Sequence, residues 1–267
     1  MSIEHAQGRY VVRAVTRAAG ILELLRSSDG GATLQQIASR SGLAKASALR
    51  MIRSLQDSGL VERVVDSDRY RLGVRTLALG QAYLEQVDFR SEAIPVLERL
   101  RQMFGETVHL GVLDDDLRVV YLDKLETTHP VGIMMSRVGR TAPSFCTGLG
   151  KALLAFRPGD PVAELEQRDA LRAYTPNTIH RPEALRAELN RIRKLGFSLD
   201  LEEHEPGVRC VASPIRGPRQ VIAAFSIAGP AHRLPERRLR GELATAALAA
   251  AEEISYRLGA IPAEAAR

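Results

Sequence analysis

The chain has 267 residues, 45% of them hydrophobic, which is enough for one or two domains with sizeable cores. It holds two cysteines, opens with no signal-peptide pattern and has no run approaching the roughly 20 apolar residues of a membrane helix, so we expect a cytoplasmic protein with no membrane partner. The net charge of +5 lies in residues 1–75, which hold 12 Lys and Arg against 7 Asp and Glu, whereas residues 76–267 hold 25 of each kind. This asymmetry is typical of a polyanion-binding module joined to a neutral one.

Two helices are predicted near the start of the chain. Residues 13–27 form an amphipathic pattern with five apolar side chains on one side: Ala14, Ala18, Ile21, Leu22 and Leu25. A second helix is predicted after Thr33, because Gln36 follows three residues later, which is the spacing of a capping box. Gly42 ends this second helix.

The third helix, predicted over residues 44–58, has two different faces. One face carries apolar residues at the spacing i, i+3, i+4 and i+7: Ala48, Met51, Ile52 and Leu55. The other carries small, polar and basic side chains that can approach a DNA groove and its phosphates: Lys45, Ala46, Ser47, Leu49, Arg50 and Arg53. An ordinary solvent-facing helix would also account for these residues.

A basic hairpin directly after this helix favours DNA binding. Two β-type runs, residues 60–65 and 69–72, flank the turn-forming residues 66–68. The hairpin would act as a wing whose basic side chains lie near a phosphate backbone: Arg63, Arg69 and Arg71. Residues 9–72 are therefore predicted to form a winged helix-turn-helix DNA-binding domain.

A linker helix is predicted over residues 73–88. Its apolar residues are too many for an isolated connector: Leu77, Leu79, Ala82, Tyr83 and Leu84. The helix packs either on its own domain or, as we prefer, against a second subunit. A dimer would set two recognition helices about one DNA turn apart, roughly 34 Å, and would require a palindromic or repeated operator.

Residues 89–260 are predicted to form a second domain of the α+β class with an antiparallel sheet. The expected helices cover residues 89–104, 150–156, 161–173, 182–195 and 235–258. The expected strands cover residues 107–113, 118–125, 131–137, 197–201, 207–216 and 220–228. Three adjacent carboxylates, Asp114 to Asp116, are interpreted as a turn between two of these strands, with a metal site as the alternative.

A glycine-rich segment, Gly148-Leu149-Gly150-Lys151, precedes one of the helices. It lacks the further glycine and the Ser or Thr of a Walker motif, so we exclude nucleotide triphosphate hydrolysis. Glycines before a helix N-terminus can leave backbone N–H groups free to hold an anion such as a carboxylate. A tight turn between strand and helix would explain the same glycines.

Polar residues gather where one late strand ends and the next begins: Asp200, Glu202, Glu203, His204, Arg209 and Cys210. An enzyme of small carboxylic acids would use Cys210 as nucleophile with His204 as base. A metal could be held by His109, His204, Asp200 or Cys210, although no paired ligand motif occurs. A pocket that binds without reacting is the main hypothesis, with no catalytic residue and no cofactor.

Several stretches together resemble the IclR family of transcription regulators along nearly the whole chain. They are LVERVVDSDRYRLG, GETVHLGVL, VYLDKLE, SRVGRTAPSFCTGLGKALLA, FSIAGPAHRL and, most distinctively, DLEEHEPGVRCVASPI. The resemblance implies a winged DNA-binding domain, a linker helix and a GAF-like effector domain that binds small organic acids. It also implies a homodimer or homotetramer that acts on operator DNA.

The same resemblance implies an effector pocket at Met134, Gly148, Leu149, Asp200, Cys210 and Ser226. An effector carboxylate would meet the backbone of the glycine loop. Ala228 stands where many members have a serine, which favours a somewhat less polar or larger effector. The recognition helix also departs from the family at Ala44, Ala46 and Leu49, so the operator sequence cannot be transferred. We predict a ligand-responsive regulator, a repressor by preference, that binds a keto, sugar or aromatic acid.

Overall fold

The computed structural model describes residues 12–127 and 136–260. The chain divides into two compact units, Met1–Gln86 and Val87–Arg267.

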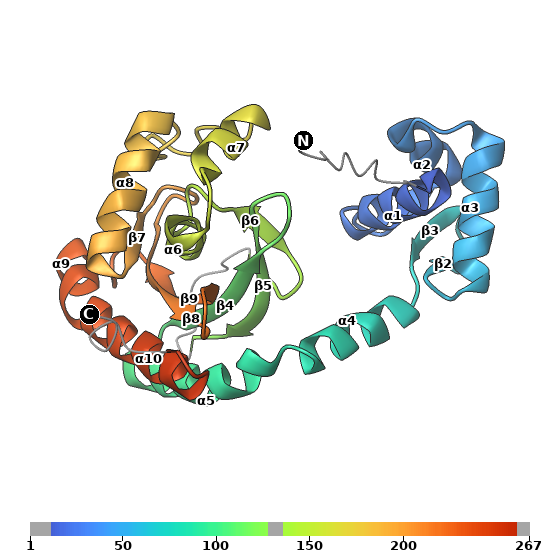
Figure 1. Ribbon diagram of the computed structural model, residues 1–267. Coiled ribbons are helices and arrows are strands. Elements are labelled where there is room, and N and C mark those ends of the chain that lie inside the picture. The colour runs from blue at the N-terminus through green and yellow to red at the C-terminus, as the bar shows by residue number, and fades with distance from the viewer. Residues whose placement is uncertain (1–11, 128–135, 261–267) are drawn as a thin grey trace, which may run out of the picture. The chain divides into compact units, whose positions relative to one another are not determined.

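Three helices build the N-terminal unit: α1 (Arg13–Arg26), α2 (Leu34–Ser41) and α3 (Lys45–Asp57) (Figure 1). The predicted capping box of α2 is present, since the Thr33 hydroxyl accepts from the Gln36 N–H at 3.2 Å and the Thr33 N–H donates to the Gln36 side chain at 2.9 Å. Gly42 ends α2 with a left-handed φ of 64°. These helices share a core with the first wing strand, centred on Ile21, Leu25, Ile37, Ile52, Leu55 and Val61.

The apolar face of α1 differs from the predicted one. Ala14 is exposed and Leu22 is only half-buried, whereas Leu24 is buried beside Leu25. Only the C-terminal half of α1 reaches the core. The prediction of an apolar face along the whole helix is therefore wrong for the N-terminal half.

A small antiparallel sheet follows the helices in the order β1-β3-β2. The wing strands β2 (Val61–Arg63) and β3 (Arg69–Leu72) confirm the predicted hairpin, and Asp66 turns the chain with a φ of 54°. The third strand, β1 (Ala32–Thr33), was not predicted because two residues carry no periodic signal. Gly31 precedes it, and a Cβ there would lie 2.4 Å from the Tyr70 carbonyl oxygen, so the close pairing of β1 with β3 requires glycine.

Helix α4 (Arg75–Glu85) buries none of its residues. Leu77 is 70% exposed and Tyr83 is 53% exposed, and Leu79 is exposed as well. Ala82 and Leu84 are half-buried, and Arg75 at the start of α4 donates to the Ser58 carbonyl at 3.0 Å. Packing of the linker on its own domain and packing against a second subunit both stay predictions, and α4 presents several exposed apolar side chains.

The C-terminal unit is built on one antiparallel sheet in the order β6-β5-β4-β9-β8-β7. Its strands are β4 (Thr107–Leu113), β5 (Arg118–Leu125), β6 (Thr141–Pro143), β7 (Ser198–Leu201), β8 (Val208–Arg216) and β9 (Val221–Pro230). The turn between β4 and β5 confirms the predicted role of the three carboxylates, because Asp114 accepts from the N–H groups of Asp116 and Arg118.

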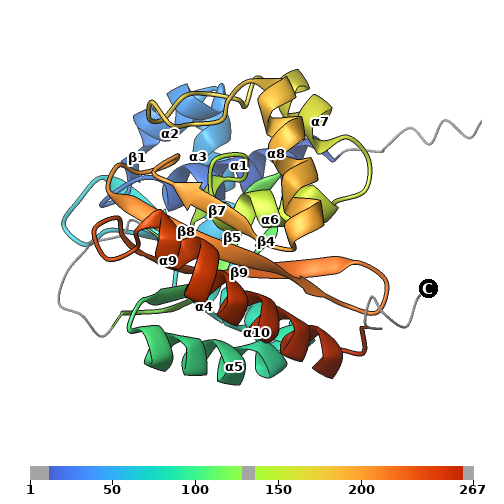
Figure 2. The same ribbon diagram turned by 90° about the vertical axis from the view of Figure 1, so that its left-hand side faces the viewer.

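Helices cover both faces of this sheet (Figures 1 and 2). On one face α5 (Asp88–Phe104) and α10 (Ala244–Arg257) pack into the largest core, around Leu97, Phe225 and Ile254. On the other face α6 (Gly148–Phe156) packs against the sheet through Leu149, Ala152 and Leu153. Helices α7 (Pro161–Gln167) and α8 (Pro182–Leu195) then cover α6 in an outer layer. The domain is α+β, as predicted.

Several predicted elements end differently. The helix expected over residues 161–173 stops at Gln167, because Asp169 takes a φ of 49° and the Ala170 N–H bonds back to the Leu165 carbonyl. The final helix is divided into α9 (Glu236–Arg238), a π-helical turn η1 (Leu239–Leu243) and α10. Strand β6 was not predicted, and most of the strand expected over residues 131–137 lies outside the described residues.

Candidate functional site: a recognition helix and a buried cavity

Helix α3 presents the side chains that were predicted to face DNA. Lys45, Ala46, Arg50 and Arg53 are exposed, while Ser47 and Leu49 are half-buried. The opposite side of α3 is anchored in the core by Ala48, Ile52 and Leu55. A rigidly packed helix thus carries three exposed cations on a face that contains small side chains, which is a geometry suited to groove entry.

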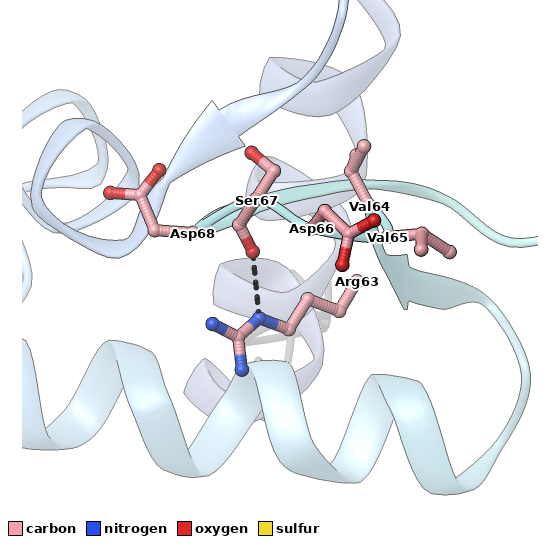
Figure 3. Close-up of a pocket in the computed structure, with 6 residues that line it drawn as sticks. All are labelled: Arg63, Val64, Val65, Asp66, Ser67 and Asp68. Carbon is pink, nitrogen blue, oxygen red and sulfur yellow. Dashed lines mark hydrogen bonds between the residues drawn. The ribbon is translucent and has the colours of Figure 1, made fainter.

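The wing arginines are held more tightly than those of α3. The Arg63 Nε donates to the Ser67 carbonyl at 3.0 Å (Figure 3), and the Arg69 guanidinium donates to the Gly31 carbonyl at 2.9 Å. The Arg71 Nε bonds the Glu62 carboxylate at 2.7 Å. Figure 3 shows Val65 and two aspartates around the tip of the hairpin, and Val65 is 83% exposed. The Arg71 charge is therefore offset by Glu62, whereas Arg63 and Arg69 are held by neutral carbonyl oxygens and keep their positive charge.

A cavity of about 50 Å³ lies between the sheet and the start of α6. Five of the six residues assigned to the effector pocket line it: Gly148, Leu149, Asp200, Cys210 and Ser226. The sixth, Met134, lies outside the described residues. The cavity also contains residues that the assignment omitted, notably His109, Tyr121, Ser136, Thr147, His204 and Ala228.

The polar lining on β4, β5 and β9 is electrically neutral. The Nε2 atom of His109 lies 2.8 Å from the Ser136 hydroxyl, and its Nδ1 atom lies 3.5 Å from the Ser226 hydroxyl. The centroids of the His109 and Tyr121 rings are 5.2 Å apart. Burial, with a smaller effect of Lys124, lowers the pKa of His109 to about 3. The imidazole is therefore uncharged near neutral pH, and burial keeps the Tyr121 hydroxyl protonated by raising its pKa.

The glycines of the segment from Gly148 to Lys151 allow α6 to pack closely against neighbouring residues. A Cβ on Gly148 would lie 2.5 Å from the Cys210 sulfur, and one on Gly150 would lie 2.3 Å from Ser144. Thr147 caps α6 by accepting from the Gly150 N–H at 3.2 Å, so this donor is already used. The Gly148 N–H bonds the Cys210 sulfur, while the Leu149 N–H has no partner among the described residues. The start of α6 therefore fits both explanations of the glycine segment: a tight turn before the helix, and a loop whose free Leu149 N–H can bind an anion in the cavity.

Lys151, the last residue of the same motif, belongs to a buried ion cluster. It is fully buried, bonds Glu203 and lies 3.8 Å from the Glu188 carboxylate. Asp200 neighbours this cluster, and its Oδ1 accepts from the Glu203 N–H at 2.7 Å. Burial and then the Glu203 charge raise the pKa of Asp200 to about 7, against the opposing effect of Lys151.

The enzyme alternative finds no suitable geometry. Burial raises the pKa of Cys210, which is the opposite of the lowered pKa of an activated nucleophile. His204 packs its ring on Tyr174 at 5.3 Å and lies 3.7 Å from Glu205, and no bond joins it to Cys210 in the described structure. Within residues 12–127 and 136–260, no three His, Cys, Asp or Glu side chains gather in a way that could hold a metal ion. No described helix is long and apolar enough to cross a membrane.

A winged helix-turn-helix unit and an α+β unit with a small polar cavity define a DNA-binding regulator with a ligand-binding domain. Family models for the IclR helix-turn-helix domain and for the bacterial transcriptional regulator IclR C-terminal domain match residues 14–64 and 81–256. The chain therefore belongs to the IclR family of transcriptional regulators, which are DNA-binding proteins and not enzymes.

Three relatives illustrate this membership. The acetate operon repressor of Salmonella typhimurium is 33% identical over 250 residues, covering 93% of this chain and 90% of that protein. The glycerol operon regulatory protein of Streptomyces coelicolor is 36% identical over 254 residues, covering 93% of this chain and 97% of that protein. A crystal structure of an IclR homolog from Microbacterium hydrocarbonoxydans in complex with 4-hydroxybenzoate matches with a TM-score of 0.77 and 27% identity, covering 92% and 99%.

Proposed function

We propose that this protein is a repressor whose affinity for operator DNA is controlled by a small organic acid bound in the cavity beside α6. The single observation that carries the proposal is this cavity, which unites the glycine loop with Asp200, Cys210 and Ser226. The acetate operon repressor and the 4-hydroxybenzoate complex among the relatives support a repressor role and an acid as the ligand class.

The polar side chains that line the cavity can hydrogen-bond the oxygen atoms of a keto, sugar or aromatic acid, so the lining fits each of these ligand classes.

The DNA-binding residues of the proposal are Lys45, Ala46, Ser47, Leu49, Arg50, Arg53, Arg69 and Arg71. Among them the exposed cations of α3 have the most freedom to reach phosphates. We propose a homodimer or homotetramer, because α4 leaves Leu77, Leu79 and Tyr83 uncovered. Two DNA-binding units would then recognise a palindromic or repeated operator.

The experiment that tests the proposed function has two stages. Thermal shifts with glyoxylate, pyruvate, gluconate and 4-hydroxybenzoate identify the ligand class, because a ligand that binds the folded state raises its stability. The affinity for DNA from the gene's own upstream region is then measured with and without the stabilising acid. We expect the acid to weaken DNA binding by about 5- to 150-fold, the usual size of allosteric coupling. A stabilising acid that leaves DNA affinity unchanged would refute the regulatory role of the cavity.

A further inference from the structure

The cavity beside α6 offers an acid no positive side chain. Its described lining contains two carboxylates, Asp200 and Glu205, and neither Lys nor Arg. The nearest cation, Lys151, is fully buried and engaged by Glu203 and Glu188, and Arg209 is bonded to Glu202 at 2.8 Å. A carboxylate that enters this space therefore meets negative charge without a compensating cation, which is costly in a buried site.

One oxygen of Asp200 is free to act on a ligand. Its Oδ1 accepts from the Glu203 N–H at 2.7 Å, whereas Oδ2 has no hydrogen-bond partner in the described part of the chain. Asp200 is 6% exposed and lines the cavity, so Oδ2 is a polar atom that a ligand can engage, together with the Leu149 N–H. Two carboxyl groups in contact are stable only when they share a proton.

Several other ionisable groups surround Asp200. Helix α6 contributes Lys151, and helix α8 contributes Glu188. The loop after β7 contributes Glu203, His204 and Glu205, while the sheet contributes His109, Tyr121 and Cys210. Cys146 precedes α6.

Burial lowers the pKa values of both histidines and raises those of the tyrosine and the cysteines, so these groups stay neutral. Burial and Glu203 raise the pKa of Asp200 to about 7, which places its titration close to neutral pH.

We infer that Asp200 is the specificity-determining residue of the cavity, because it binds the effector in its protonated form and donates that proton in a hydrogen bond to the effector carboxylate. This inference rests on the proposed function and specifies how the acid is recognised. Below pH 7 Asp200 already carries the proton, and the acid binds without exchange. Above pH 7 the complex forms only as one proton is taken from solvent, so affinity for the acid falls by up to about tenfold per pH unit.

The test uses the full-length protein and isothermal titration calorimetry with glyoxylate and pyruvate as acids and glycerol as a neutral probe. Titrations at pH 6, 7 and 8 in phosphate and in Tris separate the heat of binding from the heat of buffer deprotonation. We expect proton uptake near zero at pH 6 and rising toward one at pH 8, with about tenfold weaker binding at pH 8 than at pH 6. Uptake that stays at zero while the acid binds equally at all three pH values would overturn the inference and leave the proposed function intact.

Two variants make the assignment specific. Asp200→Asn keeps the acceptor for the Glu203 N–H and replaces the proposed O–H donor by an amide donor, so it should bind the acid with an affinity independent of pH and without proton uptake. Glu205→Gln removes the other cavity carboxylate, whose charge contributes to the raised pKa of Asp200. This variant should still take up a proton on binding the acid, with the uptake beginning at a lower pH than in the parent protein. Thermal unfolding of both variants verifies that they fold.

Three outcomes contradict the inference. Loss of acid binding in folded Asp200→Asn would mean that the ionised carboxylate is what the ligand needs. Tight, pH-independent binding of glycerol with no binding of either acid would assign the cavity to a neutral polyol. Failure of every acid to bind the parent protein at any pH would refute the organic-acid effector itself, and with it this inference.

Discussion

In the N-terminal unit the cations of α3 lie in solvent, whereas in the C-terminal unit Lys151 is fully buried between Glu203 and Glu188. Exposed charges are screened by salt and act nearly independently, so their number and spacing can be read from a sequence. Buried charges depend on each neighbour, because removal of one partner leaves the others without compensation. The first arrangement suits long-range attraction to DNA, and the second suits a site whose response depends on one proton or one ligand.

The largest effect is expected for Lys151→Met. The substitution leaves the buried Glu203 without its cation, whereas Glu188 keeps its ion pair with Arg191 at 2.6 Å. The Glu203 Oε2 already has no hydrogen-bond partner among the described residues. We expect the free energy of unfolding of the C-terminal unit to fall by about 3–5 kcal/mol. Urea unfolding of the full chain, followed by far-UV circular dichroism, measures this loss.

The matched control is Lys45→Met, which removes an exposed cation from α3. Its effect on stability should stay within about 0.5 kcal/mol. Equal effects of the two substitutions would abolish the contrast between buried and exposed charge.

A smaller loss is expected where α6 meets β8. In Gly148→Ala the new Cβ would lie 2.5 Å from the Cys210 sulfur, so α6 must shift away from the strand. Overpacking of this kind costs about 1–3 kcal/mol. The double variant with Cys210→Ala should recover part of the loss, which a double-mutant cycle of unfolding free energies would show.

Gly20→Ala serves as the control for this cycle. No heavy atom lies within 4 Å of a Cβ built there, and the residue is inside α1. It should be neutral or stabilising by up to about 1 kcal/mol. Strict additivity of Gly148→Ala and Cys210→Ala would mean that the contact does not limit the position of α6.

Much of this fold was predictable where local chemistry marks the ends of an element. Strands β4 and β5 have the predicted bounds because the aspartate turn separates two clear β patterns. Helix α8 also has its predicted bounds, since Pro182 begins it and Gly196 ends it in the left-handed conformation. The short strands β1 and β6 have no periodic pattern. Asp169 takes a left-handed conformation, which aspartate adopts more often than most residues, but no neighbouring turn residue marks this position as the end of a helix.

The candidate site was predictable only in part, for a different reason. The residue pattern indicated the glycine segment and the polar cluster from Asp200 to Cys210, and the resemblance to a family joined them into one pocket. The chain brings Gly148, Asp200 and Cys210 together from α6, β7 and β8. Tyr121 was missed because the register between β4 and β5 shifts at Leu110 and Gly111, which changes the face that its side chain occupies. The neutral state of His109 and the proton on Asp200 depend on burial, which a sequence does not contain.

On the DNA-binding face we expect a uniform loss of affinity from Arg50→Ala. Its exposed guanidinium should neutralise one phosphate, so binding to operator and to unrelated DNA should weaken alike. The slope of log affinity against log salt concentration should fall by about one per DNA-binding unit. Fluorescence anisotropy with a labelled duplex at several salt concentrations measures this slope. An unchanged slope would remove Arg50 from the proposed phosphate contacts.

The smallest effect on stability is expected for the ion pair of the wing. Arg71 bonds Glu62 at 2.7 Å with both side chains largely exposed, so Glu62→Gln should change the free energy of unfolding by less than about 1 kcal/mol. The same change releases Arg71 from its partner and removes a negative charge from the wing. DNA should therefore bind more tightly and with a steeper salt dependence, whereas Arg71→Ala should show the opposite. If Glu62→Gln leaves both affinity and slope unchanged, the wing does not contact the DNA backbone, and recognition rests on α3.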